Sequence, residues 1–155
     1  MAVSSTYHAD RQLVIIFKQK AFGIDSELHF NSQAAIFGQA VREMSKLLDI
    51  QGALTLDNQV IGFGDLYVTV YGGRTRLVGI LLGRGLNIDE AKAELNGVTL
   101  ESLVVAVRVA RAIKVNVEKG ILDKKDFPLL MHIDEILTDK KEVNIHWEQK
   151  EILQL

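Results

Sequence analysis

Residues Gly62 to Arg76 read Gly-Phe-Gly-Asp-Leu-Tyr-Val-Thr-Val-Tyr-Gly-Gly-Arg-Thr-Arg and carry two different structural signals. The alternation of Leu66, Val68 and Val70 is typical of a half-buried strand. Near the end of this stretch, Gly72 and Gly73 are followed by Arg74 to Arg76 and then by an apolar run. This order indicates a turn into the start of a helix. A helix start and guanidinium donors together suit a phosphate group. A glycine turn with solvated arginines is the alternative interpretation.

The composition is that of one globular domain. The chain has 155 residues, of which 48% are hydrophobic and 25% charged, and it has a single proline. The absence of cysteine excludes disulfides, thiolate metal sites and a cysteine nucleophile. A net charge of −2 gives no general attraction to nucleic acid or to an anionic membrane. The apolar runs are too short for a membrane helix, and Met1 to Arg11 lacks a secretory pattern, so we expect a cytoplasmic protein.

Helical periodicity covers much of the chain. Apolar residues recur every three or four positions from Ala34 to Leu48, which predicts a helix capped by Asn31 or Ser32. The inward positions are Phe37, Ala40, Val41, Met44, Leu47 and Leu48, and the outward ones are Gln39, Arg42, Glu43 and Lys46.

A second amphipathic helix is predicted from Leu100 to Lys114, with Thr99 as its cap. Its inward positions are Leu100, Leu103, Val104, Val107 and Ala110, and its outward ones are Arg108, Arg111 and Lys114. Three shorter helices are expected at Asn87–Leu95 with a capping box to Glu90, at Phe127–Thr138 with Pro128 in the first turn, and at Ile145–Leu153.

Other segments are less informative. The run from Leu13 to Phe17 fits a buried strand or the middle of a buried helix equally well. Asp123–Asp126 and Asp139–Glu142 have the mixed charges of solvated loops. The four histidines, His8, His29, His132 and His146, form no i,i+4 pair, so we expect no metal site.

The run from Gly64 to Gly79, GDLYVTVYGGRTRLVG, resembles the signature of the C-terminal domain of NAD-dependent glycerol-3-phosphate dehydrogenase, roughly G-D-L-x-x-T-C-x-G-G-R-N-R-x-V/F-G. Further similar segments follow the family's order and spacing: Asn31–Ala35, Ala40–Met44, Leu95–Gly97 and Phe127–Met131. The resemblance covers about residues 31 to 140. It implies one all-α domain over 1–155, of the 6-phosphogluconate-dehydrogenase-like kind, and helices at both ambiguous stretches.

The resemblance also assigns site residues. Asp65 falls on the family's aspartate beside the reacting carbon, Thr69 on its nearby threonine, and Arg74 on the arginine that binds the substrate phosphate. Gly73 and Thr75 flank this arginine, and Thr75 replaces an asparagine of the family pattern. Glycerol 3-phosphate or dihydroxyacetone phosphate is the ligand that the resemblance implies.

The family's catalytic lysine has no clear counterpart. An ungapped alignment places Leu13 and Val14 at the family's Lys-Asn pair, and only a shifted alignment brings Lys18 or Lys20 to that position. Loss of such a proton donor or acceptor typically lowers a rate by roughly 10²–10⁴-fold.

The sequence contains no G-x-G-x-x-G motif, so we expect no Rossmann domain and no cofactor bound by this chain alone. In the family, NAD is bound mainly by the other domain. The resemblance therefore implies a truncated or stand-alone substrate domain that is not catalytic alone, with a separate nucleotide-binding subunit and self-association as expected partners. The alternatives are a degenerate phosphate-ester-binding protein and an interaction or oligomerisation module.

Overall fold

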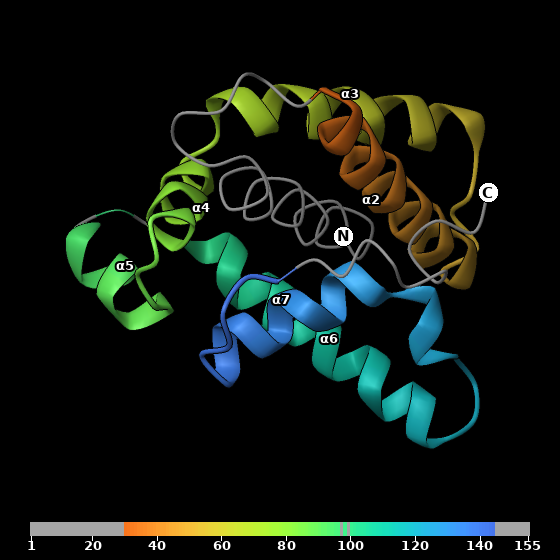
Figure 1. Ribbon diagram of the computed structural model, residues 1–155. Coiled ribbons are helices and arrows are strands. Elements are labelled where there is room, and N and C mark those ends of the chain that lie inside the picture. The colour runs from red at the N-terminus through yellow and green to blue at the C-terminus, as the bar shows by residue number, and fades with distance from the viewer. Residues whose placement is uncertain (1–29, 97, 99, 145–155) are drawn as a thin grey trace.

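The computed structural model describes residues 30–96, 98 and 100–144, and in this part of the chain every regular element is a helix (Figure 1). The elements are α2 (Phe30–Ile50), α3 (Leu56–Gly72), α4 (Thr75–Gly83), α5 (Ile88–Glu94), α6 (Glu101–Glu118), the 3-10 turn η1 (Lys124–Asp126) and α7 (Pro128–Thr138). The predictions for Leu13–Phe17, Lys18, Lys20 and Ile145–Leu153 lie outside the described residues.

The helices share one apolar core. In Figure 1, α3 runs along the top of the view, α2 descends from it on the right, α6 and α7 lie below, and α4 and α5 lie at the left. The α7 helix packs against both α6 and α2, and α4 packs against α5 and α3. Fully buried Ala106 and Ala110 of α6, and Leu130 and Ile133 of α7, belong to this core. Small side chains allow two helices to approach closely.

Local sequence signals explain several helix ends. Asn87 accepts hydrogen bonds from the backbone N–H groups of Asp89 and Glu90, and Glu90 accepts one from the Asn87 N–H, which completes the predicted capping box. Pro128 occupies the first turn of α7 as expected. The turn that follows α4 contains Gly85 with φ +96°, a conformation that side chains other than glycine adopt with strain.

The helical assignment of residues 65–71 is confirmed, because α3 runs through all of them. The strand suggested by alternating Leu66, Val68 and Val70 is therefore wrong. Tertiary packing decides here, since Leu66 is buried and Val68 is exposed on opposite sides of a helix.

Other local predictions need correction. The α2 helix begins at Phe30, so Asn31 and Ser32 lie inside it and neither caps it. The N-cap of α6 is Leu100, without a side-chain cap bond, and Thr99 lies outside the described residues. Val104, predicted to face inward, is exposed on α6, because Leu103 and Ala106 supply the inward contacts at that level.

Candidate functional site

The corner between α3 and α4 carries the residues that the sequence singled out. Asp65 and Thr69 lie one turn apart on α3, so they share one edge of the helix. The helix ends at Gly72, and the backbone N–H of Gly73 donates to the Thr69 carbonyl at 2.9 Å. Arg74 is the N-cap of α4, and its carbonyl accepts from Leu77 N–H at 3.1 Å. The predicted helix start at Arg74 is therefore confirmed.

Burial differs among these side chains in a way that suits a binding edge. Leu66 is buried in the core and fixes the rotation of α3. Its neighbour Asp65 is half-buried, and the Oδ2 atom of this carboxylate has almost no solvent contact. Thr69 is half-buried and Arg74 is exposed. The edge thus runs from a shielded carboxylate to an exposed guanidinium group.

Thr75 connects this corner to α6. Its side chain is buried, and its Oγ1 lies 2.8 Å from the Oγ of Ser102 in the first turn of α6. A hydroxyl group can donate one hydrogen bond and accept others, so Thr75 keeps some capacity for a ligand. Sequence reasoning missed Ser102, because no local pattern pairs residues that are 27 positions apart.

A buried carboxylate, Glu43 of α2, was also missed. Glu43 and Gln39 were predicted to face outward, and both are buried, so that prediction is wrong. Oε1 of Glu43 accepts from Gln39 Nε2 at 3.0 Å and from the backbone N–H of Leu129 at 2.8 Å. Oε2 accepts from the backbone N–H of Leu130 at 3.0 Å. Glu43 therefore caps the start of α7 from another helix.

Burial dominates the ionisation of Glu43. Removal from water raises the pKa of this carboxyl to about 7, although the hydrogen bonds from Gln39, Leu129 and Leu130 act in the opposite direction. A buried acidic side chain is uncommon, and here the three donors compensate for its burial only in part.

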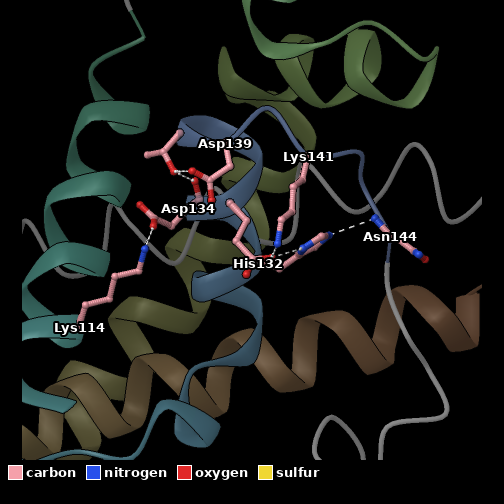
Figure 2. Close-up of polar contacts among 8 residues, drawn as sticks. Lys114, His132, Asp134, Asp139, Lys141 and Asn144 are labelled. Atoms are coloured by element: carbon pink, nitrogen blue, oxygen red, sulfur yellow. Dashed lines mark hydrogen bonds and ion pairs between the residues drawn. The ribbon is translucent and has the colours of Figure 1, made fainter. Parts of the chain in front are cut away.

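Polar contacts also attach the segment after α7 (Figure 2). Lys141 Nζ lies 3.3 Å from Glu135 Oε2, and His132 Nε2 accepts from the backbone N–H of Asn144 at 3.0 Å. On the other side of α7, buried Asp134 forms an ion pair with Lys114 of α6. The hydrogen bond to Asp134 raises the pKa of Lys114.

The segment Asp139–Glu142 is exposed, as predicted for a solvated loop, but both of its lysines form ion pairs. Lys140 Nζ lies 2.5 Å from Asp89 Oδ2 at the start of α5.

The described residues offer neither a metal-binding cluster nor a membrane-spanning helix. No group of three or more His, Cys, Asp or Glu side chains in this part of the chain could hold a metal ion. Among the described helices, none combines the length and the apolar character that crossing a membrane requires.

Comparison with known proteins decides the family. A family model described as NAD-dependent glycerol-3-phosphate dehydrogenase C-terminus matches residues 21–148. The chain belongs to this family. The match includes the α3–α4 corner with Asp65, Thr69 and Arg74, and it extends beyond the 31–140 range inferred from sequence motifs.

Members of the dehydrogenase family are the relatives found. An NADP(+)-dependent glycerol-3-phosphate dehydrogenase of Archaeoglobus fulgidus is 39% identical over 101 residues, which cover 60% of this chain and 29% of that protein. A cytoplasmic NAD(+) glycerol-3-phosphate dehydrogenase of Drosophila melanogaster is 33% identical over 119 residues, covering 74% of this chain and 31% of that protein. The chain thus spans about a third of the length of these relatives.

A solved structure supports the fold. The crystal structure of glycerol-3-phosphate dehydrogenase from Coxiella burnetii aligns with a TM-score of 0.69 at 21% identity. The alignment covers 98% of this chain and 42% of that one. The predicted all-α fold of the family's C-terminal domain is confirmed.

Proposed function

We propose that this chain supplies the glycerol-phosphate-binding half of a glycerol-3-phosphate dehydrogenase. The observation that carries the proposal is the α3–α4 corner, where Asp65 and Thr69 share a helix edge that leads directly to Arg74 at the start of α4. The family match over residues 21–148 supports the same assignment.

Each group at the corner has a role in binding a phosphate ester. Arg74 provides a guanidinium group that can hold two phosphate oxygens, and the first backbone N–H groups of α4 add partial positive charge. Gly73 and Thr75 flank this point, and Asp65 and Thr69 lie toward the carbon end of the ligand. Lys18 or Lys20 would act on the reacting oxygen only if the alignment were shifted.

The described residues do not fit NAD by themselves. A dinucleotide is held at a glycine-rich turn between a strand and a helix, and the described part of the chain contains no strand. We therefore place the nucleotide-binding unit outside the residues described here, in a separate polypeptide or domain, and we propose that these 155 residues do not transfer hydride alone. We also propose self-association. A cytoplasmic location is proposed as well, because the name of the Drosophila relative states that location for that protein.

Calorimetry with glycerol 3-phosphate tests the assignment of the corner. We expect binding by the wild-type chain and a loss of at least tenfold in affinity for Arg74→Ala, because a charge-assisted contact is removed. Arg84→Ala is the matched control, since Arg84 is also an exposed arginine next to α4 but caps the opposite end of that helix. Equal affinity of the wild type and Arg74→Ala would refute the assignment. Absence of binding in both would favour an interaction module.

A further inference from the structure

The first turns of α4 and α6 meet at a pair of hydroxyl groups. Thr75 is the first residue of α4 and Ser102 is the second residue of α6. The Oγ1 atom of Thr75 lies 2.8 Å from the Oγ atom of Ser102, a distance typical of an O–H···O hydrogen bond. Because the two residues are 27 positions apart in the chain, it is the fold that brings these two helix starts together.

The Thr75 side chain depends on this bond because it is buried. Thr75 is 5% exposed and Ser102 is half-buried, and a buried hydroxyl group without a partner is costly. A threonine side chain in a helix divides between two χ1 rotamers, since its oxygen can also bond to the backbone of the preceding turn. The bond to Ser102 selects the rotamer in which Oγ1 faces α6. The direction of the Thr75 hydroxyl group is therefore fixed beside Arg74.

The polarity of the bond is open in the free chain, since either hydroxyl group can be the donor. A hydroxyl group has one hydrogen to donate and two lone pairs that accept. If Thr75 donates to Ser102, it has no hydrogen left for an anion. If Ser102 donates instead, the hydrogen of Thr75 is free. A deprotonated phosphate oxygen only accepts hydrogen bonds, so a phosphate ester at the start of α4 selects the second arrangement.

We propose that Ser102 is a positioning residue of the glycerol-phosphate site, which donates its hydrogen to Thr75 and thereby directs the Thr75 hydroxyl group at a phosphate oxygen held by Arg74. This inference rests on the proposed function of the α3–α4 corner. The two hydrogen bonds form a chain that ends on a charged oxygen, and each bond in such a chain polarises the other. The starts of α4 and α6 both carry partial positive charge, which also favours an anion where they meet.

Calorimetry with glycerol 3-phosphate on the full chain tests the role of Ser102. Ser102→Ala removes the donor that acts on Thr75, and we expect the affinity to fall about three- to tenfold, the effect of one hydrogen bond. Ser45→Ala is the matched control, because Ser45 is also a half-buried serine bonded to another helix, accepting from Gln59 Nε2 at 3.3 Å. Ser45→Ala should bind with wild-type affinity, and circular dichroism verifies that both variants are folded. Wild-type affinity of Ser102→Ala would overturn the proposal.

A double-mutant cycle separates positioning from a general structural effect of Ser102. Thr75→Val removes the hydroxyl group through which Ser102 acts, so Ser102→Ala should cause no further loss of affinity in that background. Thr75→Ser keeps the hydroxyl group, so Ser102→Ala should again lower the affinity about three- to tenfold. An equal loss in the wild-type and Thr75→Val backgrounds, or no loss in the Thr75→Ser background, would contradict the proposed role.

Failure of this role and failure of the proposed function give different results. If Arg74→Ala loses affinity but Ser102→Ala does not, the corner binds the ligand without help from α6, and only the role of Ser102 is refuted. If the wild type does not bind, or if Arg74→Ala binds as tightly as the wild type, the corner is not the phosphate site and both proposals fail.

Discussion

At the scale of single residues, Glu43 shows how hydrogen bonds can partly offset the burial of a carboxyl group. Its carboxylate accepts hydrogen bonds from two backbone N–H groups that α7 cannot satisfy within its own first turn. Gln39 supplies a third donor from the previous turn of α2. The Glu43 side chain thus joins α2 to α7 and stabilises the first turn of α7.

The pH dependence of stability should reveal Glu43. Because its pKa is raised from 4.5 to about 7 in the folded chain, the folded state binds the extra proton between these values. The contribution of Glu43 to stability is therefore present below about pH 4.5 and is lost as the pH rises through 7, by up to about 3 kcal/mol. Urea unfolding of the wild type and Glu43→Gln across pH 4.5 to 8 measures this difference. We expect a flatter profile for the variant, and parallel profiles would contradict the assignment.

At the scale of elements, helix ends and helix pairs differ in what stabilises them. The α5 helix has only seven residues, so its capping box is a large part of its local stabilisation. The α6–α7 pair instead combines apolar packing with the ion pair of Lys114 and buried Asp134.

The capping box predicts a measurable cost. Asn87→Ala removes the acceptor for two backbone N–H groups and should lower the free energy of unfolding by about 1 kcal/mol. Glu94→Ala, at the exposed far end of the same helix, should change it by less than about 0.5 kcal/mol. Thermal unfolding of both variants makes the comparison. Equal effects would show that the cap contributes nothing specific.

The pair of Lys114 with buried Asp134 and the exposed pair of Lys46 with Asp126 should differ in strength. Lys114→Met leaves the carboxylate of Asp134 buried without its cation, and we expect a loss of about 2 kcal/mol. Lys46→Met breaks the exposed pair with Asp126, whose atoms are 3.2 Å apart, and should cost under about 1 kcal/mol. Chemical unfolding gives both values, and a larger loss for Lys46→Met would reverse the interpretation.

At the scale of the whole molecule, the described helices have the all-α fold of the C-terminal domain of the dehydrogenase family. The core draws on all six described α-helices, which positions the α3–α4 corner on a rigid support. The chain covers about a third of the length of the relatives it matches.

We expect no reaction from these 155 residues alone. Without a unit that holds the nicotinamide against the ligand, a barrier contribution of up to roughly 7–11 kcal/mol from positioning is absent. If Leu13 stands in place of the family's lysine, as the ungapped alignment has it, its lack of a proton-transferring group would add a second defect. Spectrophotometry with NADH and dihydroxyacetone phosphate should show no consumption above background. Consumption that Asp65→Asn abolishes would refute this expectation, because a contaminant would not respond to that substitution.

The amino-acid sequence by itself determined several of the helical segments and where α5 and α7 begin. The capping box at Asn87 and the proline at the start of α7 act within three or four residues of the chain. The local sequence therefore predicts both helix starts. Periodicity failed at residues 65–71, where an alternating pattern occurs in a helix, and the family's signature gave the correct assignment. The signature also identified Asp65, Thr69 and Arg74 as residues of one corner.

Only the tertiary structure decided which helix faces are covered. Glu43 meets backbone donors 86 and 87 residues away, and Thr75 meets Ser102 across 27 residues, so no local pattern reports these contacts. The same reason applies to Val104 of α6 and to Val60 and Val68 of α3, which are apolar and exposed. Periodicity shows that a helix has an apolar side, but the packing of distant helices determines whether that side is buried.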